Sequence, residues 1–398
     1  MRILIASRLF LPEPAVAATR LGALARELAA RGHQVEVLTS RPPRGTVVEE
    51  EPGVLVRRWP VLRNRQGAVR GYLPYLSFDI PLLGRLLAAR ADIVVVEPPP
   101  TTGTVVRWLC RLGRVPYVYY AADILSDAAE HAGTHRAVVA VVRRLERAAA
   151  RKAARVLSVS TDFTERLEAL GVPTDRIALV GNGADTRVYT ADDPTVEPAV
   201  ADAAPYALYA GTASEVHGAA VFVDALEHVD GLRLVYLGSG TDYAALRAAG
   251  ERQAPGRVDV LPTVAPAEAA RWLRGATVAL ASARPASGDA AAYRFFPAKL
   301  HAAAACGTPI LYAGEGSGAT FAEDAPLGTA VPYDPRAVGA ALQRALDHPA
   351  THEQRAAFAA WARERVSLAA VASRAADAIE LAAATPYRSA RPEREARP

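Results

Sequence analysis

Short apolar segments alternate with helical patterns along most of the chain. In the first half, apolar runs predict strands at residues 2–6, 34–38, 92–96, 117–120, 155–159 and 176–180. Residues 19–31 place Leu21, Leu24 and Leu28 on one face of a helix. Further helices are predicted at 136–153 and 162–169. This alternation is typical of a parallel sheet that is covered by helices.

Residues 190–205 interrupt the pattern, because they lack apolar periodicity and are rich in Pro, Asp and Ala. They predict a linker. After it the alternation restarts, with strands at 206–210, 232–237, 277–281 and 309–312 and helices at 218–228, 266–274 and 352–384. The pattern predicts an α/β protein of two doubly wound, Rossmann-like domains. Their predicted ranges are 1–189 for the first domain, 190–205 for the linker, 206–350 for the second domain, 351–387 for helices that cross back to the first domain, and 388–398 for a disordered tail.

Charge and composition narrow the class of protein. The net charge is +4, and residues 1–186 carry 26 Lys+Arg against 18 Asp+Glu. An excess of this sign favours an anionic substrate or a membrane surface, although a solvated arginine-rich surface would give the same count. No basic stretch is interleaved with aromatic residues, so we expect no nucleic-acid partner. No run reaches the ~18 apolar residues of a membrane-spanning helix. We expect a cytoplasmic protein and leave peripheral membrane contact open.

The two cysteines, Cys110 and Cys306, lie in predicted helices and share no motif spacing. We therefore expect neither a disulfide framework nor a metal site. The sequence also lacks the G-x-G-x-x-G fingerprint and the P-loop, which argues against a dehydrogenase and against a P-loop kinase.

The stretch 293–312, YRFFPAKLHAAAACGTPILY, carries the clearest chemical signal. Pro297 suits the first position of a helix, and Gly307 suits the residue just past its end. Lys299, one of only two lysines in the chain, would add a positive charge to the helix N-terminus, where anions bind. The alternative is a buried helix between two strands with an incidental lysine.

Glycines follow two successive predicted strands of the second domain. Gly211 and Thr212 end the first of these strands, and Gly238 and Gly240 follow the second. Glycine lets a ligand approach the backbone closely, although each position also fits a simple turn. Together with the helix at Pro297, these glycines at the ends of two strands predict a site for a nucleotide diphosphate.

Candidate acids and bases follow two strands of the first domain. The segment AADILSDAAEHAG contains Asp123, Asp127 and His131, and Glu97 precedes three prolines. A carboxylate here could orient a donor sugar or accept a proton. Asp127 also fits a helix cap, and Glu97 also fits an ordinary loop carboxylate.

Five segments in order resemble the family 4 glycosyltransferases of the GT-B fold, in particular a bacterial subgroup with a Pro-Ser/Ala-Lys helix. These segments are ELAARGHQVEVLTS, ARVLSVSTDFTERLEALGVPTDRIALVGNGAD, YALYAGTASEVHG, YLGSG and FPAKLHAAAACGTPIL. The resemblance implies a nucleotide-sugar donor on the C-terminal domain and an acceptor on the N-terminal domain, with transfer in a cleft between them. It also implies retention of anomeric configuration without a metal or other cofactor.

Some of the expected site residues come from the resemblance, and the others come from the residue patterns and from the departures described below. Asp123 matches an aspartate of the subgroup, and with Glu97 and Lys299 it makes up the expected catalytic set. The donor side is expected to comprise Gly211, Thr212, His217, Gly238, Gly240, Pro262, Thr263, Arg284, Arg294, Lys299 and Leu300. The acceptor side is expected to comprise Arg20, Asp127 and His131. Lys299 would neutralise the diphosphate leaving group, and Pro262 with Thr263 would hold the base.

Two departures from the family stand out. Arg294 and Ala302 occupy the positions of a glutamate pair that contacts the sugar and the ribose, and the loop TASEVHG offers Glu215 and His217 in place of Arg and Lys. We therefore expect a glycosyltransferase acting on a small-molecule or lipid-linked acceptor, as a monomer or a homodimer. The alternatives are a pseudo-glycosyltransferase that couples unusual units, a non-catalytic nucleotide-binding homologue, and a sugar epimerase.

Overall fold

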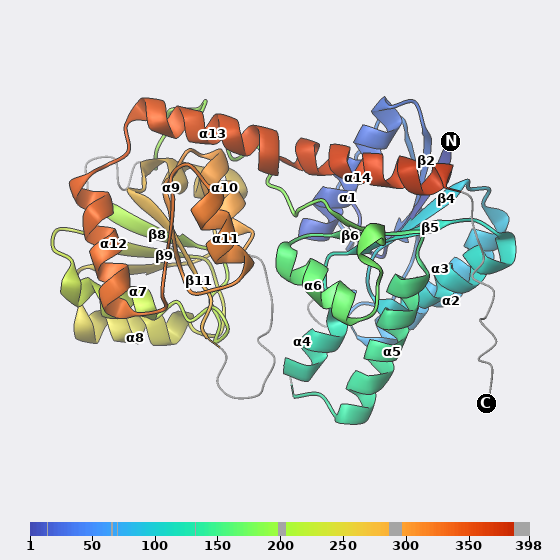
Figure 1. Ribbon diagram of the computed structural model, residues 1–398, viewed down its shortest axis with the longest axis horizontal. Helices are drawn as coiled ribbons and strands as arrows, with labels where there is room; N and C mark the ends of the chain where they lie inside the picture. Colours follow the sequence, from blue (N-terminus) through green and yellow to red (C-terminus); the bar gives the residue numbers. More distant parts are fainter. Residues whose placement is uncertain are drawn as a thin grey trace. The chain divides into compact units, whose positions relative to one another are not determined.

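The computed structural model describes residues 1–13, 15–64, 67–69, 71–131, 133–197, 204–285 and 297–385. Candidate residue Arg294 and the tail 388–398 lie outside these ranges. The chain forms two compact units, each with its own sheet (Figure 1). Unit 1 comprises Met1–Gly181 with Val371–Pro398, and unit 2 comprises Asn182–Ala370.

Unit 1 is built on a seven-stranded parallel sheet in the order β3-β2-β1-β4-β5-β6-β7. The strands are β1 (Arg2–Ala6), β2 (Gln34–Ser40), β3 (Val54–Trp59), β4 (Ile93–Val96), β5 (Tyr117–Ala121), β6 (Arg155–Ser158) and β7 (Ile177–Leu179). All four residues of β4 are buried, as expected for a central strand covered on both faces.

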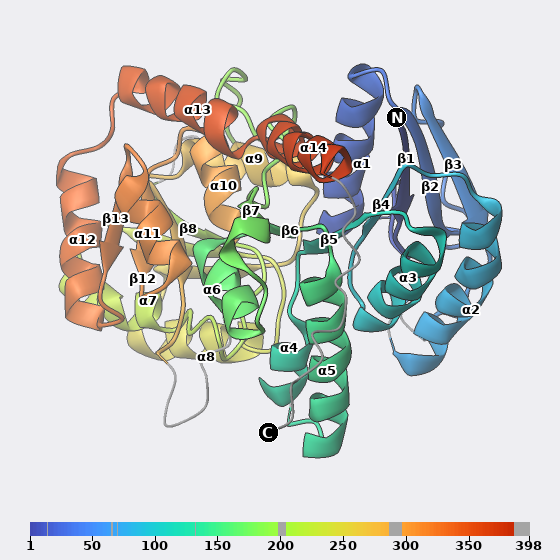
Figure 2. The same cartoon turned by 45° about the vertical axis from the view of Figure 1, so that its right-hand side comes forward.

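Helices cover both faces of this sheet. They are α1 (Val16–Ala30), α2 (Tyr72–Ala88), α3 (Pro100–Gly113), α4 (Leu125–His131), α5 (Arg136–Lys152), α6 (Thr161–Ala169), the 3₁₀ turn η1 (Thr174–Arg176) and α14 (Leu368–Ala384). Phe78 of α2, Val106 of α3 and Ala149 of α5 share one hydrophobic cluster. Leu24 of α1 and Ile379 of α14 belong to the cluster on the opposite face. Figure 2 shows α2 and α3 side by side.

Unit 2 repeats the plan with a six-stranded parallel sheet in the order β10-β9-β8-β11-β12-β13. Its strands are β8 (Tyr206–Ala210), β9 (Arg233–Leu237), β10 (Val258–Leu261), β11 (Val278–Ser282), β12 (Ile310–Ala313) and β13 (Gly328–Val331). Its helices are α7 (Val221–Asp224), η3 (Ala225–His228), α8 (Tyr243–Gln253), α9 (Pro266–Gly275), α10 (Lys299–Ala305), α11 (Ser317–Asp324), α12 (Pro335–Asp347) and α13 (His352–Val366). The predicted fold class, two doubly wound α/β sheets, is confirmed.

Local predictions around α10 are confirmed at one end and wrong at the other. Gly307 has φ +68°, and the amides of Gly307 and Thr308 donate to the carbonyls of Ala304 and Ala303, which is a Schellman motif. The helix, however, begins at Lys299 rather than at Pro297. The Pro297 carbonyl instead accepts from the Leu300 amide in a tight turn that precedes the helix.

One other helical prediction also needs correction. The predicted helix 218–228 is a short α-helix followed by a 3₁₀ turn. The helical pattern 352–384 forms two helices. Ser367 separates α13 from α14 with an extended backbone, and Leu368 donates to the Ala184 carbonyl. Of the described helices, none is both long enough and apolar enough to cross a bilayer.

Residues 190–197 of the predicted linker are attached to α9. Arg274 is buried, and its guanidinium donates to the carbonyls of Thr190 and Thr195 and to the Asp193 carboxylate. Arg271 pairs with Glu197. These bonds hold an aperiodic segment against a regular helix, which the residue pattern alone did not predict.

Candidate functional site

The predicted donor residues gather at the carboxyl ends of β8, β9 and β10 in unit 2. Ligands of doubly wound sheets bind at this end of the strands. Gly211 follows β8 with φ +126°, and Gly238 follows β9 with φ +152°. A Cβ on Gly238 would overlap the Gly211 carbonyl oxygen, so the close approach of the two turns requires a glycine at position 238.

A hollow of about 250 Å³ opens over these turns. The residues that line it are Tyr189, Ala210, Gly211, Thr212, Leu237, Gly238, Ser239, Thr263, Val264, Pro266, Ala269, Leu273, Lys299 and Ala302. Five of the predicted donor residues, Gly211, Thr212, Gly238, Thr263 and Lys299, therefore share one hollow. Val264, Pro266, Ala269 and Leu273 are apolar, whereas Lys299 supplies the one cationic side chain among the lining residues named above.

Lys299 is held at the base of this hollow by two contacts. Its Nζ donates to the Thr212 carbonyl at 3.2 Å and lies 3.5 Å from the centre of the Tyr209 ring. Tyr209 is fully buried, and its hydroxyl donates to the same carbonyl at 3.0 Å. Burial lowers the pKa of Lys299 well below its usual range. An ammonium in this position would gain from an anionic ligand.

The other predicted donor residues do not line the hollow. Gly240 has φ +149° and lies against the Ala213 carbonyl, so it shapes the loop. Leu300 is buried in the hydrophobic core, and Pro262 is exposed after β10. Arg284 is exposed, with its amide bound to the Val216 carbonyl.

His217 is half-buried beside Lys299. Its Nδ1 shares a 2.8 Å hydrogen bond with the Ser214 hydroxyl, and its carbonyl accepts from Ser282 at 2.7 Å. Burial, assisted by the nearby Lys299 charge, lowers the pKa of His217 to about 4. The imidazole is therefore neutral at pH 7, and it adds no positive charge beside Lys299.

The predicted acceptor and catalytic residues of unit 1 form a second group. Arg20 of α1 and Glu97, just after β4, make a buried ion pair, and the Ser7 hydroxyl donates to the same carboxylate at 3.3 Å. The Arg20 guanidinium lies 4.8 Å from the Tyr120 ring centre. Burial would lower the pKa of Arg20, but its pairing with Glu97 outweighs this effect and raises the pKa. Asp123 is half-buried after β5, and its charge acts on Arg20 in the same direction.

Asp127 and His131 lie on α4. The Asp127 carboxylate accepts two hydrogen bonds from Arg166 of α6, at 2.7 Å and 2.6 Å. This bidentate pair ties α4 to α6. His131 is exposed at the end of α4. The N-terminus of the same helix is held by buried Glu146, which accepts from the Leu125 amide at 2.8 Å and from the Ser126 hydroxyl at 2.5 Å.

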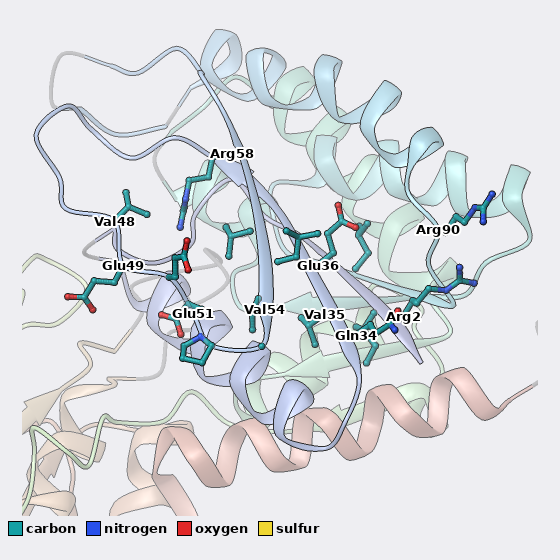
Figure 3. A pocket seen from close by; sticks show the side chains of 17 residues that line it. Arg2, Gln34, Val35, Glu36, Val48, Glu49, Glu51, Val54, Arg58 and Arg90 are labelled. Carbon is teal, nitrogen blue, oxygen red and sulfur yellow. The ribbon is translucent and has the colours of Figure 1, made fainter.

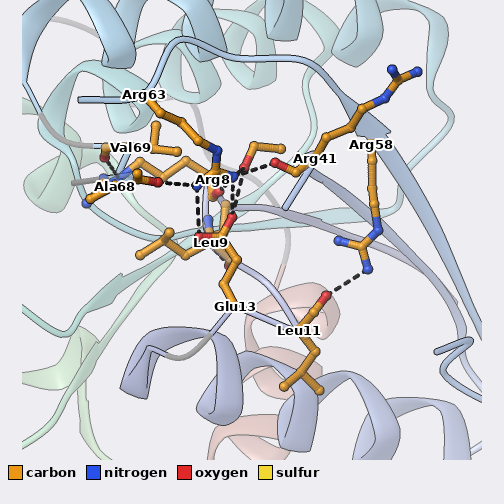
Figure 4. Close-up of polar contacts among 12 residues, drawn as sticks. Arg8, Leu9, Leu11, Glu13, Arg41, Arg58, Arg63, Ala68 and Val69 are labelled. Atoms are coloured by element: carbon orange, nitrogen blue, oxygen red, sulfur yellow. Dashed lines mark hydrogen bonds and ion pairs between the residues drawn. The ribbon is translucent and has the colours of Figure 1, made fainter. Parts of the chain in front are cut away.

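The loop after β1 is fixed by arginines that the sequence patterns did not single out (Figure 4). Arg63 donates to both Glu13 oxygens, at 2.7 Å and 3.2 Å, and Arg58 donates to the Leu11 carbonyl at 2.7 Å. Arg8 donates to the carbonyls of Val69 and Pro98. Residues that are some fifty positions apart meet here, so no local motif could have revealed the network.

Unit 1 also has a wider hollow, of about 1070 Å³, along β1, β2 and β3 (Figure 3). Arg2, Gln34 and Val54, the first residues of these strands, line it. Figure 3 shows Arg2 and Arg90 toward one end and Glu49 toward the other. This hollow lies toward the amino ends of the strands, where doubly wound sheets do not bind ligands, and it contains none of the predicted site residues.

Metal ligands do not cluster within the described ranges. No three His, Cys, Asp or Glu side chains there lie close enough together to hold a metal ion. Cys110 and Cys306 are buried and unpaired with each other, and burial raises the pKa of each thiol to about 12.

The two units match two family models. Residues 17–183 match the glycosyl transferase 4-like domain, and residues 204–348 match the glycosyl transferases group 1. The chain is therefore a glycosyltransferase. It belongs to the family 4 glycosyltransferases of the GT-B fold. None of the curated proteins is significantly similar to it in sequence.

Solved structures share the fold at low sequence identity. HepE from Anabaena, in complex with UDP and glucose, is 18% identical with a TM-score of 0.67 over 96% of this chain and 100% of its own. Sucrose-phosphate synthase from Thermosynechococcus elongatus is 17% identical with a TM-score of 0.73 over 96% and 98%. AviGT4, a glycosyltransferase involved in avilamycin A biosynthesis, is 16% identical with a TM-score of 0.61 over 97% and 99%.

Proposed function

We propose that the chain transfers a sugar from a nucleoside-diphosphate sugar to a small-molecule or lipid-linked acceptor, with retention of configuration and without a metal. The observation that carries this proposal is Lys299, held over Tyr209 inside the hollow at the carboxyl ends of β8, β9 and β10. The hollow combines an apolar part with a cationic part, as a nucleotide requires.

Different parts of the hollow suit different parts of the donor molecule. Val264, Pro266 and Leu273 offer apolar contacts to a nucleoside, and Thr263 lies beside them. We place the phosphates against the backbone turns at Gly211 and Gly238, which line the hollow together with Lys299. As the bond between the anomeric carbon and the β-phosphate oxygen breaks, negative charge grows on the diphosphate. The Lys299 ammonium would stabilise that charge without the aid of a metal ion.

UDP-sugars are the first donors to test, because HepE has been solved with UDP and with UDP-glucose. Two acceptor classes remain as alternatives, a small molecule and a lipid-linked sugar. For the lipid-linked case we propose a cytoplasmic protein in peripheral contact with the membrane, as a monomer or a homodimer.

Ligand binding tests the donor site directly. Thermal shift and calorimetry should be run with UDP, GDP, ADP and dTDP and with their sugar conjugates, on wild-type protein and on Lys299→Ala. Lys152→Ala is the matched control, because Lys152 is the only other lysine and is exposed on α5. We expect one nucleotide class to raise the Tm of the wild type and of Lys152→Ala but not of Lys299→Ala. Equal shifts in all three proteins would contradict the role of Lys299.

One observation favours a second function, the coupling of unusual units by a pseudo-glycosyltransferase. The described residues that line the hollow include no Asp or Glu, and Ala302 stands where relatives carry a glutamate. A carboxylate accepts hydrogen bonds from sugar hydroxyls, and alanine does not. Mass spectrometry of reactions with nucleotide sugars and candidate acceptors separates the two functions. A product with a new glycosidic bond supports sugar transfer, and consumption only of donors that carry a non-sugar unit supports the alternative.

A further inference from the structure

Helix α2 of unit 1 presents an apolar face to solvent. Six of its large apolar side chains are between 40% and 69% exposed, namely Tyr72, Leu73, Leu76, Ile80, Leu83 and Leu87. Residues 73, 76, 80, 83 and 87 recur at intervals of three and four, so they form one stripe along the helix. Isolated exposed leucines are ordinary, whereas a continuous stripe marks a contact surface.

The charged residues of α2 do not interrupt this stripe. Asp79 is buried and accepts from the Thr102 hydroxyl at 2.6 Å, and Arg85 lies over the Trp59 ring at 4.4 Å. The inward face carries Phe78 and Leu82, which pack in the core of unit 1. The helix is thus apolar both toward the core and toward solvent.

The adjoining end of α3 extends the surface and gives it a charge. α3 packs against α2, and its Trp108 and Leu112 are 61% and 75% exposed. Arg111 and Arg114 are exposed beside them, and Arg107 lies 5.3 Å from the Trp108 ring. The sequence from residue 98 to residue 116 contains no Asp or Glu.

Helix α5, which packs against α3, adds charge of the same sign. Arg144, Arg147 and Arg151 are exposed along it, whereas its one acidic residue, Glu146, is buried under α4. An apolar stripe thus lies next to a band of arginines within one layer of unit 1.

We propose that this α2–α3 face, comprising the six α2 side chains named above with Trp108, Leu112, Arg111 and Arg114, docks unit 1 on an anionic lipid bilayer. The leucines, the isoleucine and the aromatic rings enter the boundary between headgroups and acyl chains, and the arginines bind lipid phosphates. Charge decides between a bilayer and a second copy of the chain. Pairing two such faces brings no anionic groups to the arginines, whereas the phosphates of anionic headgroups do. The inference goes beyond the proposed transfer reaction, because the face needs no nucleotide.

Vesicle flotation without nucleotide tests this proposal. Wild-type protein is mixed with vesicles of phosphatidylcholine alone and with vesicles of equal parts phosphatidylcholine and phosphatidylglycerol. We expect binding to the anionic vesicles that falls as salt is raised. The double variant Leu76→Glu/Ile80→Glu should bind at least about tenfold more weakly, and Arg111→Glu/Arg114→Glu should lose the preference for anionic vesicles. The matched control is Leu381→Glu, an exposed leucine of α14 on the opposite side of the sheet.

Melting temperatures and light scattering complete the test. All these changes are at exposed positions, so each variant should keep the Tm and the nucleotide-induced shift of the wild type. A failure of the proposed donor site would leave vesicle binding unchanged, so the two proposals fail separately. Vesicle binding that is unaffected by Leu76→Glu/Ile80→Glu would overturn the assignment. So would a lipid-free dimer that this variant splits into monomers without any binding to vesicles.

Discussion

Arg20 and Glu97 form a buried ion pair that joins α1 to the end of β4, and each side chain is less than 7% exposed. The two residues are 77 positions apart, and the sheet order β1-β4 brings their elements together. Sequence reasoning placed Arg20 on the acceptor side and Glu97 among the catalytic residues. In the structure these two residues pair with each other. Any catalytic role of Glu97 would therefore involve a carboxylate that Arg20 already binds.

Removing one partner of this pair should be costly. Arg20→Met leaves the Glu97 charge buried and unpaired, and we expect a loss of about 3–5 kcal/mol in the free energy of unfolding. The double variant Arg20→Met/Glu97→Met should lose less than either single variant. Urea denaturation measures the free energy of unfolding of the single and the double variants. The control is Arg2→Met, which breaks the exposed Arg2–Asp92 pair and should lower the free energy of unfolding by less than about 1 kcal/mol. Similar losses for Arg20→Met and Arg2→Met would contradict this reading of the pair.

Nucleotide binding should take up a proton at Lys299. Burial lowers the pKa of Lys299 in the ligand-free protein, and a bound diphosphate favours the ammonium and raises that pKa. Affinity should therefore be greatest below the ligand-free pKa and should fall as the pH rises through it. Calorimetry in buffers of different ionisation enthalpy measures the uptake. Lys299→Arg stays charged throughout and should show less uptake than the wild type, whereas Lys152→Arg should match it.

The turn after β9 should tolerate no side chain at Gly240. A Cβ there would overlap the Ala213 carbonyl, and φ is +149°. We expect Gly240→Ala to lower stability by at least about 2 kcal/mol and to weaken nucleotide binding. Gly231→Ala is the control, since its φ of +72° is also left-handed but the space around it is open. It should cost about 1 kcal/mol and leave the affinity unchanged. Comparable effects of the two changes on binding would show that the turn does not shape the site.

Glu146 should make stability depend on pH. Burial raises its pKa from the ordinary 4.5 to about 7, despite its hydrogen bonds to Ser126 and Leu125. Between these two values the folded protein binds more protons than the unfolded chain, so the free energy of unfolding falls as the pH rises through this window. The full effect is roughly 3 kcal/mol. Denaturation between pH 5 and pH 8 should show a flatter profile for Glu146→Gln than for the wild type. Glu165→Gln, at an exposed position of α6, should keep the wild-type slope.

The sequence by itself determined the class of fold and singled out five of the residues that line the hollow of unit 2. Strands β1 and β8 were predicted at their observed bounds, because a buried strand of a parallel sheet must be apolar on both faces and flanked by turns. Gly211, Gly238 and Lys299 were predicted because a phosphate site needs close backbone and a cation, and these requirements leave local signatures. Thr263 was expected only from the family resemblance.

Only the tertiary structure decided what the charged side chains do. Several ion pairs join residues that are 39 to 77 positions apart, namely Arg20 with Glu97, Arg63 with Glu13 and Asp127 with Arg166. The short-range periodicity of a sequence does not reveal partners at such separations. The residue patterns predicted no helix at 72–88, so they did not reveal the apolar stripe of α2. Only packing shows which face of a helix the core leaves uncovered, because burial depends on neighbours that the chain supplies from elsewhere.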